Sequence, residues 1–118
     1  MTQNIYDSLI TIFPKLFKGK CTKTIFSCGP GWYNLILTAC KKLSQNPKLK
    51  IQSVKCISGC LHIKVINSTE AEQKYIYYVQ AQSLDTCEVC GKMGKLENID
   101  GDYKTLCVIH KRDYPSVV

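Results

Sequence analysis

Four residues near the C-terminal end have the types and the spacing of a metal site. They form two pairs, Cys87 with Cys90 and Cys107 with His110, and two residues separate the members of each pair. A two-residue gap lets both side chains of a pair reach one ion from a tight turn, and two pairs complete the tetrahedral shell that structural zinc prefers. Gly91 follows Cys90, and a backbone without a Cβ can turn sharply there and direct its amide at thiolate sulfur. The sequence therefore predicts one Zn²⁺ per chain, bound by these four side chains.

The segment between the two pairs is expected to form a β-hairpin. Residues 95–99 and 103–106 have the composition of two short strands, and Asp100-Gly101 between them is a strong signal for a hairpin turn. Such a hairpin has almost no core of its own, so a bound metal would have to hold its shape. Because protein side chains fill all four positions of the shell, the zinc is expected to be structural and not to catalyse a reaction.

The composition predicts a folded α+β protein. The chain has 118 residues, of which 45% are hydrophobic and 21% charged. We expect a small helical and β-hairpin body over residues 1–84, followed by a zinc-ribbon or treble-clef-like hairpin module over residues 85–118. No apolar run approaches the roughly 20 residues that span a bilayer, and the N-terminal segment lacks the features of a signal peptide. With eight cysteines and no export signal, reduced thiols in a cytoplasm are expected in place of disulfides.

The spacing of apolar residues predicts the elements of the body. Trp32, the only tryptophan, falls on the first turn of the clearest amphipathic helix and is expected to anchor the core. Asn4 is the expected N-cap of the first helix, and Pro14 is expected to end it. The expected elements are a helix over 5–13, a helix over 32–44, strands over 48–57 and 60–67 around Ser58-Gly59, and a helix over 69–84 capped by Ser68 or Thr69. The expected shared core comprises Trp32, Leu35, Ile36, Leu61, Ile63, Tyr75 and Val79.

Positive charge is concentrated in the first part of the chain. Residues 1–69 hold ten lysines against one acid, a formal charge of +9, whereas residues 70–118 have a formal charge of −2. This split favours an anionic partner such as nucleic acid or an acidic protein surface, although lysines that only keep the protein soluble would produce it equally well. Only one of the sixteen basic residues is arginine, so base-specific readout is not expected. The candidate partner-binding residues are Lys41, Lys42, Lys48, Lys50, Lys55 and Lys64.

Four further cysteines leave a second metal site open. Cys56 and Cys60 are expected to face one another across the hairpin turn, and His62 is a candidate nitrogen ligand beside them. The intervals that separate Cys21 from Cys28 and Cys56 from Cys60 match no common zinc spacing, and buried cysteine is a frequent core residue. The sequence therefore favours a structural role for these thiols over a second site.

The residue types that catalysis requires are scarce. The chain has two histidines, and one of them is assigned to zinc. It has no Gly-rich phosphate loop, no nucleophile with a recognisable base, and no carboxylate pair in an apolar setting. We therefore expect no catalytic residues and no enzymatic activity, and a metal-dependent nuclease is the least favoured function.

Several motifs along the chain resemble a family of small uncharacterised proteins encoded by tailed phages and prophages, whose C-terminal zinc module has the pattern Cys-x-x-Cys…Cys-x-x-His/Cys. The resemblance runs from about Ile5 to His110. It departs from the family at Cys60, where the family has a glycine, and at Asp102, where it has a tryptophan. The matching segments are Phe13-Pro14-Lys15-Leu16-Phe17, Gly29-Pro30-Gly31-Trp32, Val54-Lys55, Gly59, Leu61, Cys87-Glu88-Val89-Cys90-Gly91 and Thr105-Leu106-Cys107.

The resemblance implies a mobile-element protein that acts in the cytoplasm of a bacterial host. The favoured function is then a non-catalytic binder that inhibits a host protein or protein–nucleic-acid complex, foremost a bacterial immune complex of the CRISPR–Cas type. The alternative is a regulator or accessory protein that binds nucleic acid directly through its lysine-rich face. Basicity that is almost all lysine, and the lack of a helix-turn-helix pattern, count against sequence-specific binding in that alternative.

Overall fold

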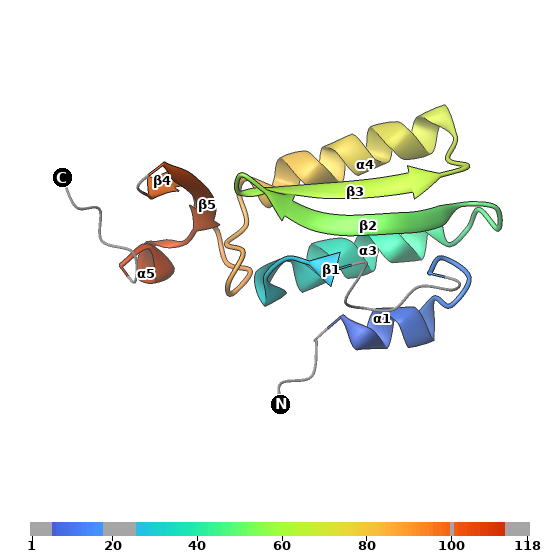
Figure 1. Ribbon diagram of the computed structural model, residues 1–118, viewed down its shortest axis with the longest axis horizontal. Helices are drawn as coiled ribbons and strands as arrows, with labels where there is room; N and C mark the ends of the chain where they lie inside the picture. The colour runs from blue at the N-terminus through green and yellow to red at the C-terminus, as the bar shows by residue number, and fades with distance from the viewer. Residues whose placement is uncertain (1–5, 18–25, 100, 113–118) are drawn as a thin grey trace.

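Two β-sheets of different size organise the chain. The computed structural model describes residues 6–17, 26–99 and 101–112. Within these ranges, the expected α+β class is confirmed (Figure 1). The elements, in chain order, are α1 (Asp7–Ile12), β1 (Phe26–Ser27), the 3-10 helix η1 (Pro30–Trp32), α3 (Tyr33–Leu43), β2 (Lys50–Ile57), β3 (Cys60–Ile66), α4 (Glu70–Ser83), β4 (Lys95–Ile99), β5 (Asp102–Leu106) and α5 (Val108–Lys111).

The larger sheet has the strand order β1-β2-β3. β2 and β3 form the predicted antiparallel hairpin, and β1 pairs with β2 in parallel, with Phe26 opposite Val54. Ser58 and Gly59 both have positive φ, as a two-residue hairpin turn requires. Residues on one face of the hairpin, including Leu61 and Ile63, are buried, so this face carries the core and the opposite face is open.

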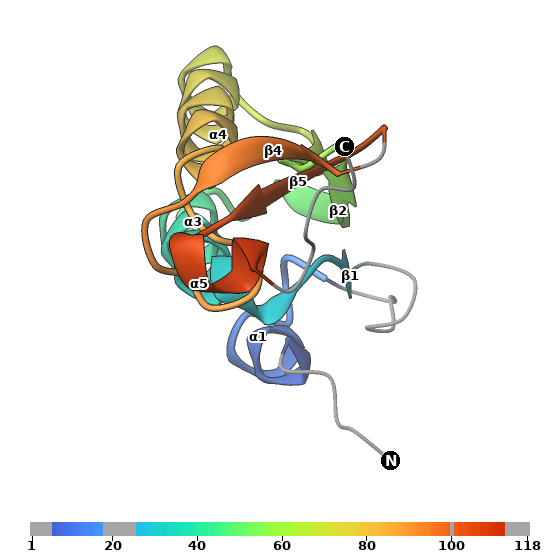
Figure 2. The same ribbon diagram turned by 90° about the vertical axis from the view of Figure 1, so that its left-hand side faces the viewer.

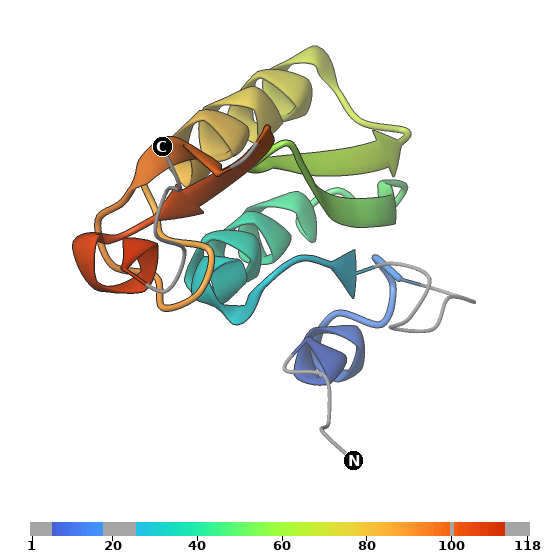
Figure 3. The ribbon, with the colours of Figure 1, turned by 60° about the vertical axis from the view of Figure 1, so that its left-hand side comes forward.

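Helices α3 and α4 lie side by side on the buried face of the hairpin, as Figures 1 and 3 show. Trp32 has no exposed surface, so its predicted role as core anchor is confirmed. The other six predicted core residues belong to the same cluster, four of them buried and two, Leu35 and Tyr75, partly buried. The first helix ends before Pro14 as expected, whereas its predicted N-cap, Asn4, lies outside the described residues.

The outer edge of β3 is closed by side chains from α4. Ser83 Oγ accepts a hydrogen bond from the backbone N–H of Leu61 at 2.9 Å, and Gln80 Oε1 accepts one from the N–H of Ile63 at 3.0 Å. Unpaired edge groups invite pairing with another strand, and these two bonds remove that opportunity over the middle of β3. Thr69 begins α4 with a capping box that includes Glu72, which confirms Thr69 over Ser68 as the cap.

The smaller sheet is the antiparallel hairpin of β4 and β5, and it lies at one end of the body (Figures 1 and 2). Its strands match the predicted ranges closely, and Gly101 in the turn has a φ of 87°. Asn98 Oδ1 accepts a hydrogen bond from the N–H of Gly101 at 2.8 Å, which holds the turn closed. Of the helices that the structure describes, none has the length and apolar character to cross a membrane.

Candidate metal centre

The first two candidate ligands lie on a tight turn directly after α4. The backbone N–H of Cys87 donates to Lys92 O at 2.7 Å, and the N–H of Gly91 donates to Cys87 O at 2.9 Å. Gly91 has a φ of 85°, and a Cβ built there would lie 2.9 Å from Gly31 O. The turn therefore requires glycine both for its left-handed backbone and for its close approach to Gly31.

The other two candidate ligands come from the start of α5. Cys107 is the N-cap residue of this helix, and its Sγ accepts a hydrogen bond from the backbone N–H of His110 at 3.5 Å. β5 leads directly into this cap, so the hairpin brings the second pair back to the turn that holds the first. α5 was absent from the sequence prediction because one turn of helix is too short to show a periodic pattern.

The four predicted ligand atoms lie within 4.8 Å of one another and form a group that can hold one metal ion. Cys90 Sγ lies 3.7 Å from Cys107 Sγ, and His110 Nδ1 lies 3.6 Å from Cys87 Sγ and 3.2 Å from Cys107 Sγ. A tetrahedral zinc site with Zn–S of about 2.3 Å and Zn–N of about 2.0 Å places two sulfurs about 3.8 Å apart and a sulfur and a nitrogen about 3.5 Å apart. The donor types suit such an ion, and these three distances are close to the tetrahedral values.

Backbone N–H groups prepare two of the three thiols for ionisation. The N–H of His110 holds the pKa of Cys107 below its usual value. Burial opposes ionisation of Cys87, yet the backbone N–H groups of Cys107, Cys90 and Val89 together lower its pKa. At Cys90 the N–H of Lys92 favours the thiolate, but partial desolvation and the adjacent Cys107 and Cys87 raise its pKa. Three thiols this close cannot all ionise without repulsion, which a bound cation would relieve.

A set of close contacts fixes this metal module, residues 85–112, to the body, residues 6–84. The indole Nε1 of Trp32 donates to Thr86 O at 2.8 Å, and the N–H of Gly31 donates to Glu88 O at 2.8 Å. Thr105 Oγ1 donates to Gly59 O at 2.7 Å in a buried position. A Cβ on Gly31 would collide with the carbonyl of Cys87, so the Gly29-Pro30-Gly31 segment is a docking surface for the module.

The structure corrects one expectation about the remaining cysteines. Cys56 pairs with Leu61 and Cys60 pairs with Ile57, so Cys56 and Cys60 point to opposite faces of the hairpin and do not face one another. Cys56 Sγ donates to Glu88 Oε2 at 3.7 Å, whereas Cys60 Sγ contacts Gln80 O at 3.7 Å. In the described part of the chain, the only group of three or more candidate ligands is the one at the metal module. Cys21 lies outside the described residues.

The interior thiols are poor nucleophiles. Burial raises the pKa of Cys28 and of Cys56 to about 11, with a further contribution from the charge of Glu88 in both cases. Burial alone raises the pKa of Cys40, in the centre of the core, to about 12. These three thiols therefore stay protonated at neutral pH and act as core side chains.

The six candidate partner-binding lysines do not form one surface. Lys55 and Lys64 lie on the open face of the hairpin, and Lys50 lies at its far end, opposite Ile66. Lys41 and Lys42 belong to the last turn of α3, where Lys42 Nζ lies 5.2 Å from the centre of the Tyr75 ring. Lys48 precedes β2, in the connection that follows α3. The open sheet face thus carries one group of these lysines, and the end of α3 carries another.

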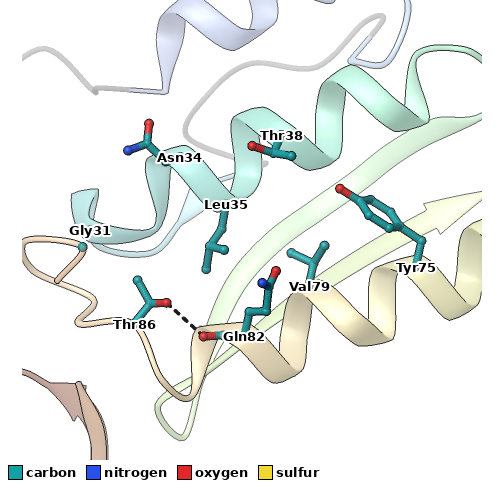
Figure 4. A pocket seen from close by; sticks show the side chains of 9 residues that line it. Gly31, Asn34, Leu35, Thr38, Tyr75, Val79, Gln82 and Thr86 are labelled. Atoms are coloured by element: carbon teal, nitrogen blue, oxygen red, sulfur yellow. Dashed lines mark hydrogen bonds between the residues drawn. The ribbon is translucent and has the colours of Figure 1, made fainter. Parts of the chain in front are cut away.

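A shallow hollow of about 310 Å³ lies between α3 and α4, where they meet the metal module (Figure 4). Leu35 and Val79 give it an apolar floor, and Thr86 Oγ1 at its rim donates to Gln82 O at 2.9 Å. None of the described residues that line it is charged. The hollow therefore presents no carboxylate or histidine as a general base and no cationic side chain. Its lining residues are Gly31, Asn34, Leu35, Thr38, Tyr75, Val79, Gln82, Thr86 and Gly91.

Comparisons with protein-family models, with curated proteins and with solved structures find no match to this chain. The resemblance to phage-encoded proteins stays a prediction.

Proposed function

We propose that the chain is a non-catalytic binding protein whose metal module is held together by one structural Zn²⁺. The observation that carries this proposal is the convergence of the four candidate ligand atoms within 4.8 Å of one another, with three of their separations between 3.2 and 3.7 Å, close to the edges of a tetrahedral zinc shell. The order of the elements, a turn with two ligands, a hairpin and a short helix with two ligands, supports a treble-clef-like module. A shell with four protein ligands has no open position for a substrate, so the zinc supplies shape and no reaction.

Metal analysis of two matched cysteine variants tests the zinc assignment. Protein purified without added metal is expected to carry one zinc per chain. Cys90→Ser is expected to lose the metal, and because Cys90 is exposed, this loss cannot be attributed to a packing defect. Cys60→Ser is the control, since Cys60 is a half-buried thiol outside the ligand group, and it is expected to keep the zinc. A zinc content near zero in the unaltered protein contradicts the assignment.

The partner that this proposal assigns is an anionic host complex in a bacterial cytoplasm. The formal charge of +9 over residues 1–69 supports an anionic partner, and the open sheet face presents Lys55 and Lys64 together. The resemblance to phage-encoded proteins supports inhibition of a host defence complex, with a CRISPR–Cas complex as the first candidate. Neither line of support requires a chemical step by this chain.

A plaque assay tests the inhibition. Bacteria whose CRISPR–Cas system targets a phage are infected with and without expression of the chain, and expression is expected to restore plaque formation. The control strain lacks the immune complex, and plaque numbers there are expected not to change. Cys60→Ser is expected to protect the phage as well as the unaltered chain does. If plaques are not restored in a set of strains that covers the main types of these complexes, a CRISPR–Cas target is ruled out.

A further inference from the structure

The open face of the β2–β3 hairpin, which is turned to the viewer in Figure 1, has a distinct chemistry. Lys55 lies opposite His62, and Ser53 lies opposite Lys64, so two lysines and an imidazole are adjacent on this face. β2 and β3 contain three lysines and one histidine and no acid. The face is therefore positively charged along its length.

Helix α4 forms one wall of a shallow hollow of about 480 Å³ beside this face. Tyr77 lines the hollow with 61% of its surface exposed, and the amides of Gln73 and Gln80 line the same wall. Gln80 uses Oε1 to accept the N–H of Ile63, and this bond holds its side chain at the hollow. None of the described residues that line the hollow is acidic. It thus combines cations, an exposed aromatic ring and amide groups within one small space.

We propose that this open face binds single-stranded nucleic acid, with Lys55 and Lys64 on phosphates and the ring of Tyr77 stacked on a base. This assignment rests on the proposed function and names the chemistry of its anionic partner. Proteins that bind single strands combine a cationic groove with aromatic side chains on which bases stack, and the face presents both. An acidic peptide would satisfy the lysines but would leave the exposed ring and the amide wall of the hollow without a role.

The shape of the face favours a single strand over a duplex. The bases of a duplex are stacked inside it, so Tyr77 would reach only its backbone. Many duplex readers insert a helix into the major groove, and here α3 and α4 pack against the opposite face of the hairpin, so neither helix is presented on this face. The lysines position phosphates and carry little base information, so binding is tolerant of sequence.

Fluorescence anisotropy with labelled oligonucleotides of about 12 nucleotides tests the proposal. The zinc-loaded full chain is titrated into single-stranded RNA, single-stranded DNA and a duplex of the same sequence. Both single strands are expected to bind more tightly than the duplex, and comparison of the RNA and DNA arms identifies the preferred strand. Two lysine–phosphate contacts predict that affinity falls about sevenfold from about 50 to about 200 mM salt.

Two pairs of matched variants place the binding on this face. Lys55→Glu with Lys64→Glu is expected to weaken single-strand binding about tenfold or more, whereas the same charge change at Lys41 and Lys42 leaves it nearly unchanged. Tyr77→Ala is expected to weaken binding about fivefold or more through lost stacking. Tyr78→Ala is its control, because Tyr78 is 60% exposed on the same helix but does not line the hollow. Circular dichroism of each variant is expected to match that of the unaltered chain.

Three results overturn the proposal: no binding of single strands at low salt, equal losses in the two lysine pairs, or tighter binding of the duplex. A different result separates it from the proposed function. If the unaltered chain restores plaques and the Lys55 and Lys64 pair abolishes that effect, but single strands do not bind, the partner at this face is an acidic protein surface. In that case the proposed function stands and this inference fails.

Discussion

The body and the metal module owe their shape to different interactions. Among the described residues, the body has a continuous cluster of seventeen buried hydrophobic residues, whereas the buried hydrophobic cluster of the module has three members, Cys87, Leu106 and Cys107, of which two are candidate ligands. A cluster of the first size can stabilise a fold by hydrophobic burial alone, and one of the second size cannot. We therefore expect the module to depend on a bound metal ion and on its contacts with the body.

Removal of the metal is the strongest way to test this difference. A chelator is expected to unfold the module, because structural zinc contributes on the order of 10 kcal/mol to small metal-dependent folds. The body is expected to keep α3 and α4, since both helices pack into the large core. Far-ultraviolet circular dichroism after chelation is therefore expected to retain most of its helical signal, and added zinc is expected to reverse the change.

Trp32 provides an independent readout of the same experiment. Its ring is buried in the body, and its Nε1 donates to Thr86 O at the junction with the module. Loss of the module would expose this edge of the ring to water, so the emission maximum is expected to move to longer wavelength. If chelation changes neither the emission of Trp32 nor the hydrogen-exchange protection of β4 and β5, the module is stable without metal. In that case the body and the module do not differ in the way described above.

The junction between the body and the metal module allows a second test, of whether the module depends on its contacts with the body. Gly31→Ala would push a Cβ into the carbonyl of Cys87 and is expected to destabilise the docked module by about 1–3 kcal/mol. The zinc itself is expected to remain bound, because none of the four ligands changes. Hydrogen exchange and the emission of Trp32 are expected to report a loosened module on an intact body.

A matched control for this variant is Gly101→Ala, at the turn of β4 and β5. A Cβ there meets nothing within 4 Å, but the φ of 87° makes alanine strained. Its effect is expected to stay within the hairpin and not to reach Trp32. Equal changes of Trp32 emission in the two variants would show that Gly31 has no special part in docking.

Local patterns were sufficient to predict most elements, because their causes lie within a few residues. The helix that contains Trp32, the β2–β3 hairpin and the pair of module strands all follow from periodicity and turn residues. The four candidate ligands were predictable for the same reason, since each pair lies on one turn. β1 was missed because a two-residue strand has no pattern.

Contacts between distant segments were not predictable from single-sequence patterns. Gly31 contacts residues 87 and 88, more than fifty positions later, and no local rule indicates that approach. The orientation of Cys56 and Cys60 was a different kind of error. Leu61 and Ile63 already indicated the buried face of β3, so Cys60 had to lie on the other face with His62. Consistent use of strand alternation would have corrected that expectation.

The smallest predicted effect concerns the cap of α4, which belongs to the body and does not touch the metal. Thr69 Oγ1 accepts a hydrogen bond from the N–H of Glu72, and Glu72 Oε1 accepts one from the N–H of Thr69 at 2.8 Å. Thr69→Ala is expected to cost about 1 kcal/mol in global stability, measured by denaturant unfolding of the zinc-loaded protein. Zinc content is expected to be unchanged.

The pH dependence of this cap follows from the charge of Glu72. The hydrogen bond from the backbone N–H of Thr69, aided by Asn46, lowers the pKa of Glu72 below its ordinary value of 4.5. The folded state therefore favours the carboxylate, so this stabilisation is complete above about pH 4.5 and is lost as the pH falls through the lowered pKa. Glu72→Gln is expected to reduce the acid sensitivity of unfolding, while Glu70→Gln, which changes an exposed i,i+4 pair with Lys74, is expected to leave it nearly unchanged. If Glu72→Gln and Glu70→Gln show the same dependence of unfolding stability on pH in acid, the capping carboxylate contributes nothing to the stability of the body.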